Sequence, residues 1–209
     1  MAVRAKVIGS SFVTNLADYI ADPQHGGLLS NMQLDPDFAT VEVSGVRGLR
    51  VHKLPTFKPD LETNTPDLVI MHCGGNDLAK RDSLSVAVEM HDFASYLVED
   101  LHVDKVVMLS TLKRFSVRSD GCLKYGIPEN VFHAKAFDLN LRLSHLFDNN
   151  HMYFWDLRTL QGEQTCWTGL AEDGVHLNEV GMKKYYREIR GAIIESAEEI
   201  HGTPYAYWL

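Results

Sequence analysis

Short apolar segments alternate with amphipathic patterns along this chain, and that order constrains its fold more than any other feature. Five segments are brief and rich in β-branched or aromatic residues, as buried parallel strands are. They cover residues 5–8, 40–43, 67–72, 105–109 and 152–155. This alternation predicts an α/β fold, a three-layer α/β/α sandwich around a five-stranded parallel sheet with right-handed crossovers.

Apolar residues spaced three and four apart predict three helices between and after these strands. The first buried stripe comprises Leu84, Ala87, Val88, His91, Ala94, Val98 and Leu101. The second comprises Phe132, Ala136, Leu139, Leu143 and Leu146, and the third Met182, Tyr185, Tyr186, Ile189, Ile193, Ala197 and Ile200. Pro128 suits the first turn of the second helix, where a missing N–H costs nothing. His91 is interpreted as a hydrogen-bonded core residue without a chemical role.

Length and charge limit the number of domains and the kind of partner. The chain has 209 residues, of which 45% are hydrophobic, and single domains commonly reach about 200 residues. We therefore expect one domain over residues 1–209. The formal net charge of -8 argues against nucleic acid as a partner of this domain, because nonspecific binding of phosphate backbones depends on Lys and Arg.

The cysteines and the apolar runs bear on the cellular compartment. Cys73, Cys122 and Cys166 are odd in number and form no Cys-x-x-Cys pair, so neither a disulfide framework nor a zinc site is predicted. No run approaches the roughly 20 apolar residues of a membrane span. The apolar run near the N-terminus ends at Gly9-Ser10-Ser11, so it is too short to form the hydrophobic core of a signal peptide. These features favour an intracellular, cytoplasmic location.

Asp173-Gly174-Val175-His176 precedes the last predicted helix and combines two residues with complementary chemistry. An Asp and a His three residues apart on one turn can present a general base together with the carboxylate that orients it. Ser11 directly follows the first predicted strand and is the natural candidate for a nucleophile. Because reactive groups of such sheets gather at the carboxyl ends of the strands, these residues are expected to converge.

Glycine-rich junctions follow the second and third predicted strands. Gly45 and Gly48 lie after the second strand, and Gly74-Gly75-Asn76-Asp77 follows the third. The four blocks Gly-x-Ser, Gly-x-x-Gly, Gly-x-Asn-Asp and Asp-x-x-His resemble, in this order, the signature blocks of the SGNH (GDSL-type) hydrolase family. Each block alone is weak, but all four in order at strand ends are specific. The resemblance covers nearly the whole chain and implies a flavodoxin-like sheet.

The resemblance assigns a role to each block. It implies that Ser11 is the nucleophile, that His176 is the general base and that Asp173 orients the imidazole. Ser needs such a base, because its hydroxyl is a poor nucleophile at its free pKa. The resemblance also implies an oxyanion hole made by the backbone N–H of Ser11, a glycine N–H after the second strand and the side-chain amide of Asn76.

Two details of the blocks bear on this assignment. Gly45 or Gly48 could supply the glycine N–H, and the family register favours Gly48 as donor. Most relatives carry Asp before the nucleophile, whereas this chain carries Ser10. The phrases around Ser11, Asn76 and His176 also look like those of SGNH esterase domains in animal retrotransposon proteins, including LINE-type first open reading frames. On that narrower likeness, the chain would be one domain of a larger protein.

Plainer structural roles exist for the same residues. Ser11 could be an N-cap, since Ser is favoured where a strand turns into a helix. Asn76 and Asp77 could be turn residues. Asp173-Gly174 could form a tight turn before a helix capped at Asn178. For Cys73, at the end of a buried strand, we expect a packing role, because burial keeps a thiol neutral.

Two predicted loops are long enough to shape specificity. The first, residues 111–127, is interpreted either as a mobile basic lid or as a solvated surface loop. Its basic residues are Lys113, Arg114, Arg118 and Lys124. The second, residues 157–172, brings Trp167 and Leu170 close in sequence to Asp173, where they could form a wall for an acyl group or simply pack the loop.

The resemblance implies a serine esterase that hydrolyses a small-molecule, short-chain carboxylic ester, such as an acetyl ester, through an acyl-enzyme. Acyl transfer to an alcohol is possible with the same residues. The alternative is a catalytically idle SGNH-like module that binds RNA, lipid or protein. No metal or cofactor is predicted, because the sequence lacks a His-Glu-x-x-His motif, a Cys pair and the glycine patterns of nucleotide sites.

Overall fold

A parallel sheet forms the centre of the computed structural model, which describes residues 1–25, 27, 29–123, 126–161 and 168–208. The strands are β1 (Val3–Gly9), β2 (Ala39–Gly45), β3 (Leu68–His72), β4 (Lys105–Leu109) and β5 (Met152–Trp155). Their order is β2-β1-β3-β4-β5, and every neighbouring pair is parallel. The predicted five-stranded parallel sheet is confirmed, with exact bounds for β4 and β5.

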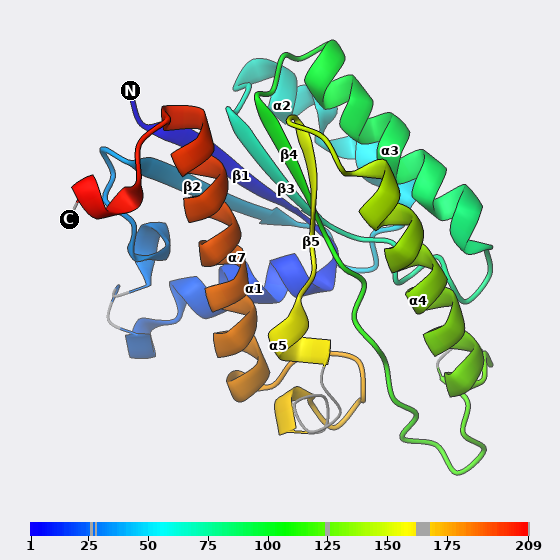
Figure 1. The fold of residues 1–209 in the computed structure, drawn as a ribbon. Helices are drawn as coiled ribbons and strands as arrows, with labels where there is room; N and C mark the ends of the chain where they lie inside the picture. Colours follow the sequence, from blue (N-terminus) through cyan, green and yellow to red (C-terminus); the bar gives the residue numbers. More distant parts are fainter. Residues whose placement is uncertain (26, 28, 124–125, 162–167, 209) are drawn as a thin grey trace.

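Helices cover both faces of this sheet (Figure 1). On one face lie α1 (Ser11–Ala21) and α7 (Glu179–His201), and on the other α2 (Lys58–Thr63), α3 (Ser83–Glu99) and α4 (Glu129–Leu146). Shorter helices connect these elements: η1 (Pro23–His25), η2 (Ser30–Gln33), η3 (Val51–Phe57), α5 (Arg158–Gln161) and η4 (Tyr205–Trp208). The architecture is the predicted three-layer α/β/α sandwich. No helix in the described part of the chain is both long and apolar enough to cross a membrane.

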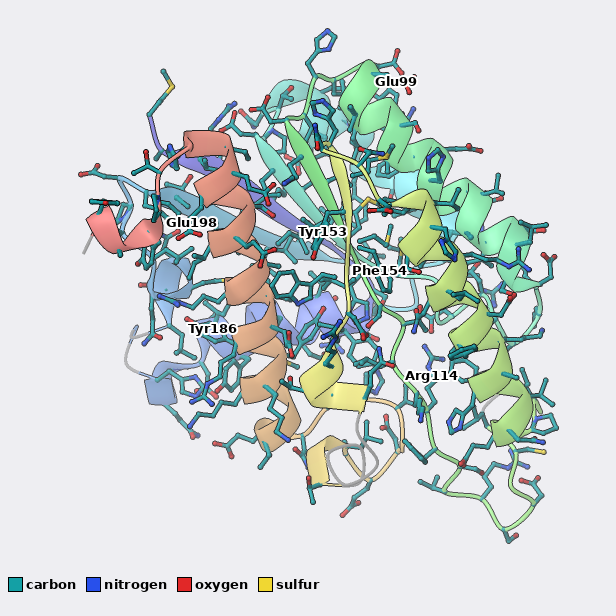
Figure 2. The ribbon with its side chains drawn as sticks, viewed as in Figure 1. Glu99, Arg114, Tyr153, Phe154, Tyr186 and Glu198 are labelled. Atoms are coloured by element: carbon teal, nitrogen blue, oxygen red, sulfur yellow. The ribbon has the colours of Figure 1, made fainter. Side chains whose placement is uncertain are left out.

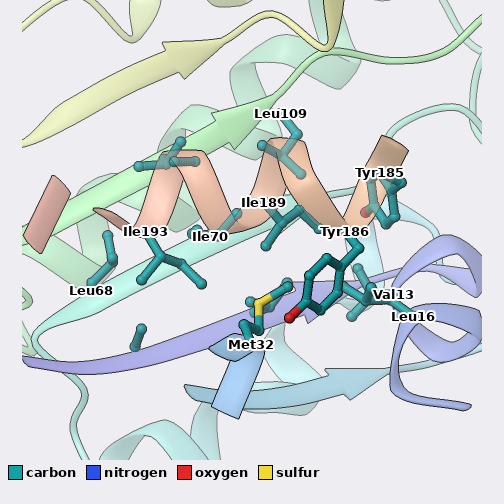
Figure 3. Close-up of a cluster of buried hydrophobic side chains, with 14 of the residues drawn as sticks. Val13, Leu16, Met32, Leu68, Ile70, Leu109, Tyr185, Tyr186, Ile189 and Ile193 are labelled. Atoms are coloured by element: carbon teal, nitrogen blue, oxygen red, sulfur yellow. The ribbon is translucent and has the colours of Figure 1, made fainter. Parts of the chain in front are cut away.

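The core is divided by the sheet into two hydrophobic layers. Successive side chains of β3 alternate between them, because strand side chains point to opposite faces. Leu68 and Ile70 pack in the layer under α1 and α7, whereas Val69 and Met71 pack in the layer under α3 and α4. Figure 3 shows the first layer, in which side chains of α7 lie over the sheet and Tyr186 lies beside Met32.

The buried stripe of α3 differs from the predicted one. Leu84 and Val88 are 53% and 45% exposed, and Leu101 follows the end of the helix. The buried residues are Ser83, Val86, Ala87, Met90, Phe93, Ala94 and Leu97. Apolar residues surround much of this helix, so two overlapping sets of residues recur at helical spacing. Packing against α4 buries the set that was not predicted. His91 is half-buried, with its ring edge toward Phe147.

The other two stripes agree with the structure. In α4, Phe132, Ala136, Leu139 and Leu143 are buried, and Leu146 is partly buried. Pro128 is the N-cap of α4 rather than a residue of its first turn, because its backbone is still extended at ψ 141°. In α7 the predicted residues are buried except for Ile200, which packs against the core at its edge.

The strand order places a crevice at the candidate site. In a sheet of order 2-1-3-4-5, the connections leave β1 and β3 toward opposite faces, and ligands bind at the carboxyl ends of these two strands. Ser11 follows β1 and Gly74-Gly75-Asn76-Asp77 follows β3. The topology therefore brings two sequence blocks more than 60 residues apart to the same crevice.

Candidate active site

Ser11 is the first residue of α1 and lies immediately beyond the end of β1. Ser10 is the N-cap residue, so the interpretation of Ser11 as the N-cap is wrong by one position. A Cβ on Gly9 would lie 2.3 Å from the carbonyl oxygen of His72. Only glycine therefore allows β1 to end against β3, where the backbone N–H of Ser10 donates to that oxygen at 3.0 Å. This junction fixes the start of α1.

Asp173 organises the turn that carries His176. Its Oδ1 accepts hydrogen bonds from the backbone N–H groups of Val175 and His176, both at 2.9 Å. Its Oδ2 lies 2.5 Å from Nδ1 of His176. One carboxylate thus holds both the backbone and the ring of the histidine.

The imidazole of His176 bridges Asp173 and Ser11. Its Nε2 lies 3.1 Å from Oγ of Ser11, although the two residues are 165 positions apart in the chain. Phe12 packs beside the imidazole, with ring centroids 6.1 Å apart. The structure brings together the three side chains that the sequence singled out, within hydrogen-bonding distance and in the order Asp173, His176, Ser11.

The carboxylate of Asp173 is electrostatically suited to a cationic imidazole. Partial burial acts to raise its pKa, but the backbone N–H groups of His176 and Val175 and the His176 ring lower it by more. The pKa of Asp173 therefore lies below its ordinary value, and the group is ionised at neutral pH. An ionised carboxylate stabilises positive charge on the neighbouring ring.

The turn also caps the last helix, as the plainer interpretation expects. Asn178 accepts a hydrogen bond from the backbone N–H of Gly181 at 3.0 Å and is the N-cap of α7. The Asn178 amide donates to the carbonyl oxygens of Thr168 and Leu170, each at 2.9 Å. The predicted cap at Asn178 is therefore confirmed, and it ties the start of α7 to the segment just before the Asp173–His176 turn.

Gly174 allows the long loop after β4 to approach this turn. Gly174 has φ 68°, and its carbonyl oxygen accepts a hydrogen bond from the backbone N–H of Phe115 at 2.8 Å. A Cβ on Gly174 would lie 2.0 Å from the carbonyl oxygen of Phe115. Both the left-handed backbone and the close approach therefore require glycine.

Gly174→Ala should lower the free energy of unfolding by at least about 2 kcal/mol, because a left-handed backbone and a steric clash add together. Gly121→Ala is the matched control, since Gly121 has φ 66° and nothing within 4 Å of a built Cβ. The control should lose about 1 kcal/mol from backbone strain alone. Urea denaturation of both variants measures the difference, and equal losses would show that the approach of Phe115 adds nothing.

Asn76 and Asp77 connect the end of β3 to the loop after β2. Nδ2 of Asn76 donates to the carbonyl oxygen of Leu49 at 3.0 Å, and the Asp77 carboxylate accepts from the backbone N–H of Val51 at 3.2 Å. Asp77 is buried, and this desolvation raises its pKa. The two side chains do more than form a turn, because they hold the segment that contains Gly48.

The two glycines after β2 occupy different environments. A Cβ on Gly45 would lie 2.3 Å from the backbone nitrogen of Thr14, so Gly45 allows β2 to pack against α1. Gly48 has φ 71° and lines the same cavity as Ser11 and Asn76. Gly48 is therefore among the residues that line this cavity, and Gly45 is not.

A cavity of about 520 Å³ opens over Ser11 and His176. This volume is in the range of small-molecule sites. The described residues of the loop 111–127 contribute much of the wall, and residues 117–121 of the same loop are exposed to solvent, so features of both predicted interpretations are present. Its lining residues are Arg114, Phe115, Ser116, Val117, Arg118, Cys122 and Leu123. In Figure 1 this long connection descends past the carboxyl end of the sheet before it returns to α4.

Arg114 belongs to the predicted basic loop, but its contact with Asn76 was not indicated by the sequence. It lies on the connection between β4 and α4 (Figure 2). Its Nη2 donates to Oδ1 of Asn76 at 2.9 Å, and its guanidinium lies 5.2 Å from the ring centroid of Phe132. The backbone carbonyl of Arg114 accepts from Nε2 of His133 at 2.7 Å. Arg114 therefore fixes which way the Asn76 amide is turned.

A buried layer lies behind the site. Nδ1 of His72 lies 2.6 Å from the hydroxyl of Tyr185, and Phe12 packs against both rings. Burial, with a smaller effect from the Arg114 charge, lowers the pKa of His72 to about 3, so its imidazole is neutral. Burial raises the pKa of the Cys73 thiol, which agrees with a packing role.

Several predicted residues fall outside the site or outside the described residues. Leu170 packs against the core layer under α7 and is not among the residues lining the cavity. Lys124, Trp167 and Cys166 lie outside the described residues. Among the residues that the structure does describe, no group of three or more His, Cys, Asp or Glu side chains is placed to hold a metal ion.

Comparisons with known proteins show the family and the fold of this chain. The sequence model of a family described as GDSL-like lipase/acylhydrolase matches residues 9–189. No curated protein sequence gives a significant match. A GDSL-like lipase from Bacteroides thetaiotaomicron is 18% identical, with a TM-score of 0.67, over 92% of this chain and 88% of that one.

Two further solved structures share the fold. A lipase/acylhydrolase from Enterococcus faecalis is 16% identical, with a TM-score of 0.64, over 92% of this chain and 95% of that one. A catalytic mutant of an acetylxylan esterase from Geobacillus stearothermophilus is 16% identical, with a TM-score of 0.63, over 91% and 94%. At these identities the likeness shows the fold alone.

Proposed function

The chain belongs to the GDSL-like lipase/acylhydrolase family and is a carboxylic ester hydrolase, and we propose that it acts on short-chain esters through an acyl-enzyme formed on Ser11. One observation carries the proposal. His176 lies with Nε2 3.1 Å from Oγ of Ser11 and with Nδ1 2.5 Å from the Asp173 carboxylate. A nucleophile within reach of a base, and a base oriented by a third group, is the arrangement that nucleophilic acyl transfer requires.

Acylation begins with attack by Oγ of Ser11 on the carbonyl carbon of the ester. Nε2 of His176 takes the hydroxyl proton as the new bond forms, and Asp173 stabilises the resulting imidazolium through Nδ1. Collapse of the tetrahedral intermediate expels the alcohol, which leaves with the proton returned by Nε2. The products of this half are the free alcohol and an ester on Ser11.

The negatively charged oxygen of the tetrahedral intermediate has to be stabilised by hydrogen-bond donors, and we propose three. They are the backbone N–H groups of Ser11 and Gly48 and the Nδ2 amide of Asn76. Ser11 lies in the first turn of α1, where backbone N–H groups have no partner within the helix and the helix dipole favours negative charge. Nδ2 of Asn76 carries two hydrogens and donates one to Leu49. Losing one such donor typically costs about 3 kcal/mol of transition-state stabilisation.

Arg114 is proposed to position Asn76 for this task. Because its guanidinium donates to Oδ1 of Asn76, the amide is held with Nδ2 as the exposed donor. A cation on the carbonyl oxygen also polarises the amide and strengthens its N–H groups as donors.

Deacylation repeats these proton transfers with water in place of the alcohol. Water takes the position of the alcohol and attacks the acyl carbon while Nε2 of His176 removes one of its protons. The second tetrahedral intermediate then collapses to a carboxylic acid as Nε2 returns that proton to Oγ of Ser11. An alcohol in place of water would give acyl transfer with the same groups. A binding module without catalysis has less support, because Ser11, His176 and Asp173 retain a reactive geometry.

The proposed acyl group is short, of the acetyl type. Acetylxylan esterases occur among the structural neighbours, and the cavity of about 520 Å³ has to hold both the acyl and the alcohol portions. Within a p-nitrophenyl series, kcat/KM should fall at least tenfold from acetate to octanoate, because a long apolar chain would desolvate the guanidinium groups of Arg47, Arg114 and Arg118 that line the cavity. Initial rates at equal pH measure this, and a maximum at octanoate would contradict the short-chain assignment.

A further inference from the structure

The cavity over Ser11 concentrates positive charge in a protein that is negative overall. The formal net charge of the chain is -8. Yet three arginines line this cavity, Arg47, Arg114 and Arg118, and among its described lining residues Asp173 is the one acidic group. The Asp173 carboxylate is already bound by two backbone N–H groups and the His176 ring. The charge of the cavity lining is therefore opposite in sign to the net charge of the chain.

Arg114 brings its charge close to the reacting groups. Its Nη2 contacts Oδ1 of Asn76, and a Cβ on Gly75 would lie 3.0 Å from the same nitrogen. A guanidinium held by Asn76 and Phe132 is preorganised and loses little side-chain entropy on binding an anion.

Arg47 and Arg118 lie at the rim of the cavity and can exchange partners. Arg47 donates to the Asp18 carboxylate and to Oδ1 of Asn15, each at 3.0 Å, and Arg118 donates to Asp120 at 2.9 Å. In both pairs the side chains are about half exposed or more, between 48% and 68%. Exposed ion pairs contribute little stability, so either arginine can turn toward an anion in the cavity at small cost.

We propose that this cavity selects carboxylic esters that carry an anionic group, a carboxylate or a phosphate, near the scissile bond. The inference rests on the proposed esterase function and specifies its substrate class. Guanidinium groups bind both anions through paired N–H donors, which an ammonium or a neutral side chain cannot match. An anionic group on the substrate would explain why three arginines line the cavity, because hydrolysis of a neutral ester does not require them.

Matched pairs of esters test the proposal. On the alcohol side, 4-acetoxybenzoate is compared with its neutral methyl ester; on the acyl side, mono-4-nitrophenyl adipate is compared with 4-nitrophenyl methyl adipate. The readout is the ratio of kcat/KM for the anionic over the neutral member. Comparing this ratio between variants cancels the intrinsic reactivity of each ester. The pair that responds shows on which side of the ester the anion binds.

Arg47→Gln, Arg114→Gln and Arg118→Gln should each lower that ratio in at least one pair, by about tenfold where the guanidinium contacts the anion. Arg142→Gln is the matched control, because Arg142 lies on α4 in an ion pair with Asp138 and does not line the cavity. Its ratio should equal that of the wild type. The wild-type ratio should also fall as salt is raised, because ions screen these charges.

Two results separate failure of this inference from failure of the proposed function. Hydrolysis of all four esters with the same ratios in the three variants as in Arg142→Gln would overturn the anionic selectivity and leave the esterase intact. If the wild type hydrolyses none of the four esters faster than Ser11→Ala does, the proposed esterase function is wrong, and the proposed selectivity is wrong with it. Circular dichroism of every variant establishes that each is folded.

Discussion

Ser11→Ala should lower kcat/KM for p-nitrophenyl acetate by at least about 10⁴-fold, because no acyl-enzyme can form without Oγ. The remaining donors and His176 would still bind the ester and assist water, so the residual rate should exceed that of buffer. Steady-state rates of the wild type and the variant, at equal pH and with both folds checked by circular dichroism, measure the loss.

Ser10→Ala is the matched control for this experiment. Ser10 is the neighbouring hydroxyl and the N-cap residue of α1, but its side chain makes no capping hydrogen bond. Its removal should therefore leave a substantial part of the activity. Equal activity in Ser11→Ala and the wild type would refute the nucleophile assignment, and loss in Ser10→Ala alone would move the nucleophile by one residue.

Asp173→Asn should lower kcat by about 10⁴-fold, by the same effect that an amide has in other Ser-His-Asp sites. Oδ1 of Asp173 holds the turn, so the amide oxygen is expected to keep the backbone N–H groups of Val175 and His176. The amide nitrogen would then face Nδ1 of His176. A donor in that place favours the tautomer in which Nε2 carries the proton and cannot accept one from Ser11.

The control for Asp173→Asn is Asp22→Asn. Asp22 accepts the backbone N–H of Gln24 at 2.8 Å, a similar local turn, but lies away from Ser11 at the C-terminal end of α1. Its activity should be unchanged. The double variant Ser11→Ala/Asp173→Asn should be no slower than Ser11→Ala, since residues that act as one unit do not add. A loss below tenfold in Asp173→Asn would contradict the orienting role.

The sheet could be predicted because its strands carry their signal locally. β4 and β5 are short runs of β-branched, apolar or aromatic residues, and their predicted bounds match the structure. The helix α1 was not predicted, because it begins directly after β1 at Ser10-Ser11 and is short, although its apolar residues Phe12, Val13, Leu16, Tyr19 and Ile20 recur at helical spacing. The predicted buried stripe of α3 was wrong at Leu84 and Val88, which are exposed. Spacing alone could not show which of the two apolar faces of this helix packs against α4.

The candidate site also contains residues that could be predicted from the sequence and one contact that could not. Asp173 and His176 lie on one turn and could be paired from the sequence, because the hydrogen bonds that join them span three residues. Ser11 could be added because it directly follows a predicted strand, and parallel strands end at one edge of the sheet. Arg114 could not be assigned to Asn76, because their contact spans 38 residues and depends on the course of an irregular loop.

Covalent labelling tests the central claim most directly. A fluorophosphonate should phosphonylate Oγ of Ser11 with loss of fluoride, because His176 can take the hydroxyl proton as the new bond forms. Intact-protein mass spectrometry should show one adduct in the wild type and none in Ser11→Ala, and peptide mapping should place it on Ser11. An adduct on another residue, or persistent labelling of Ser11→Ala, would contradict the claim that Ser11 is the nucleophile.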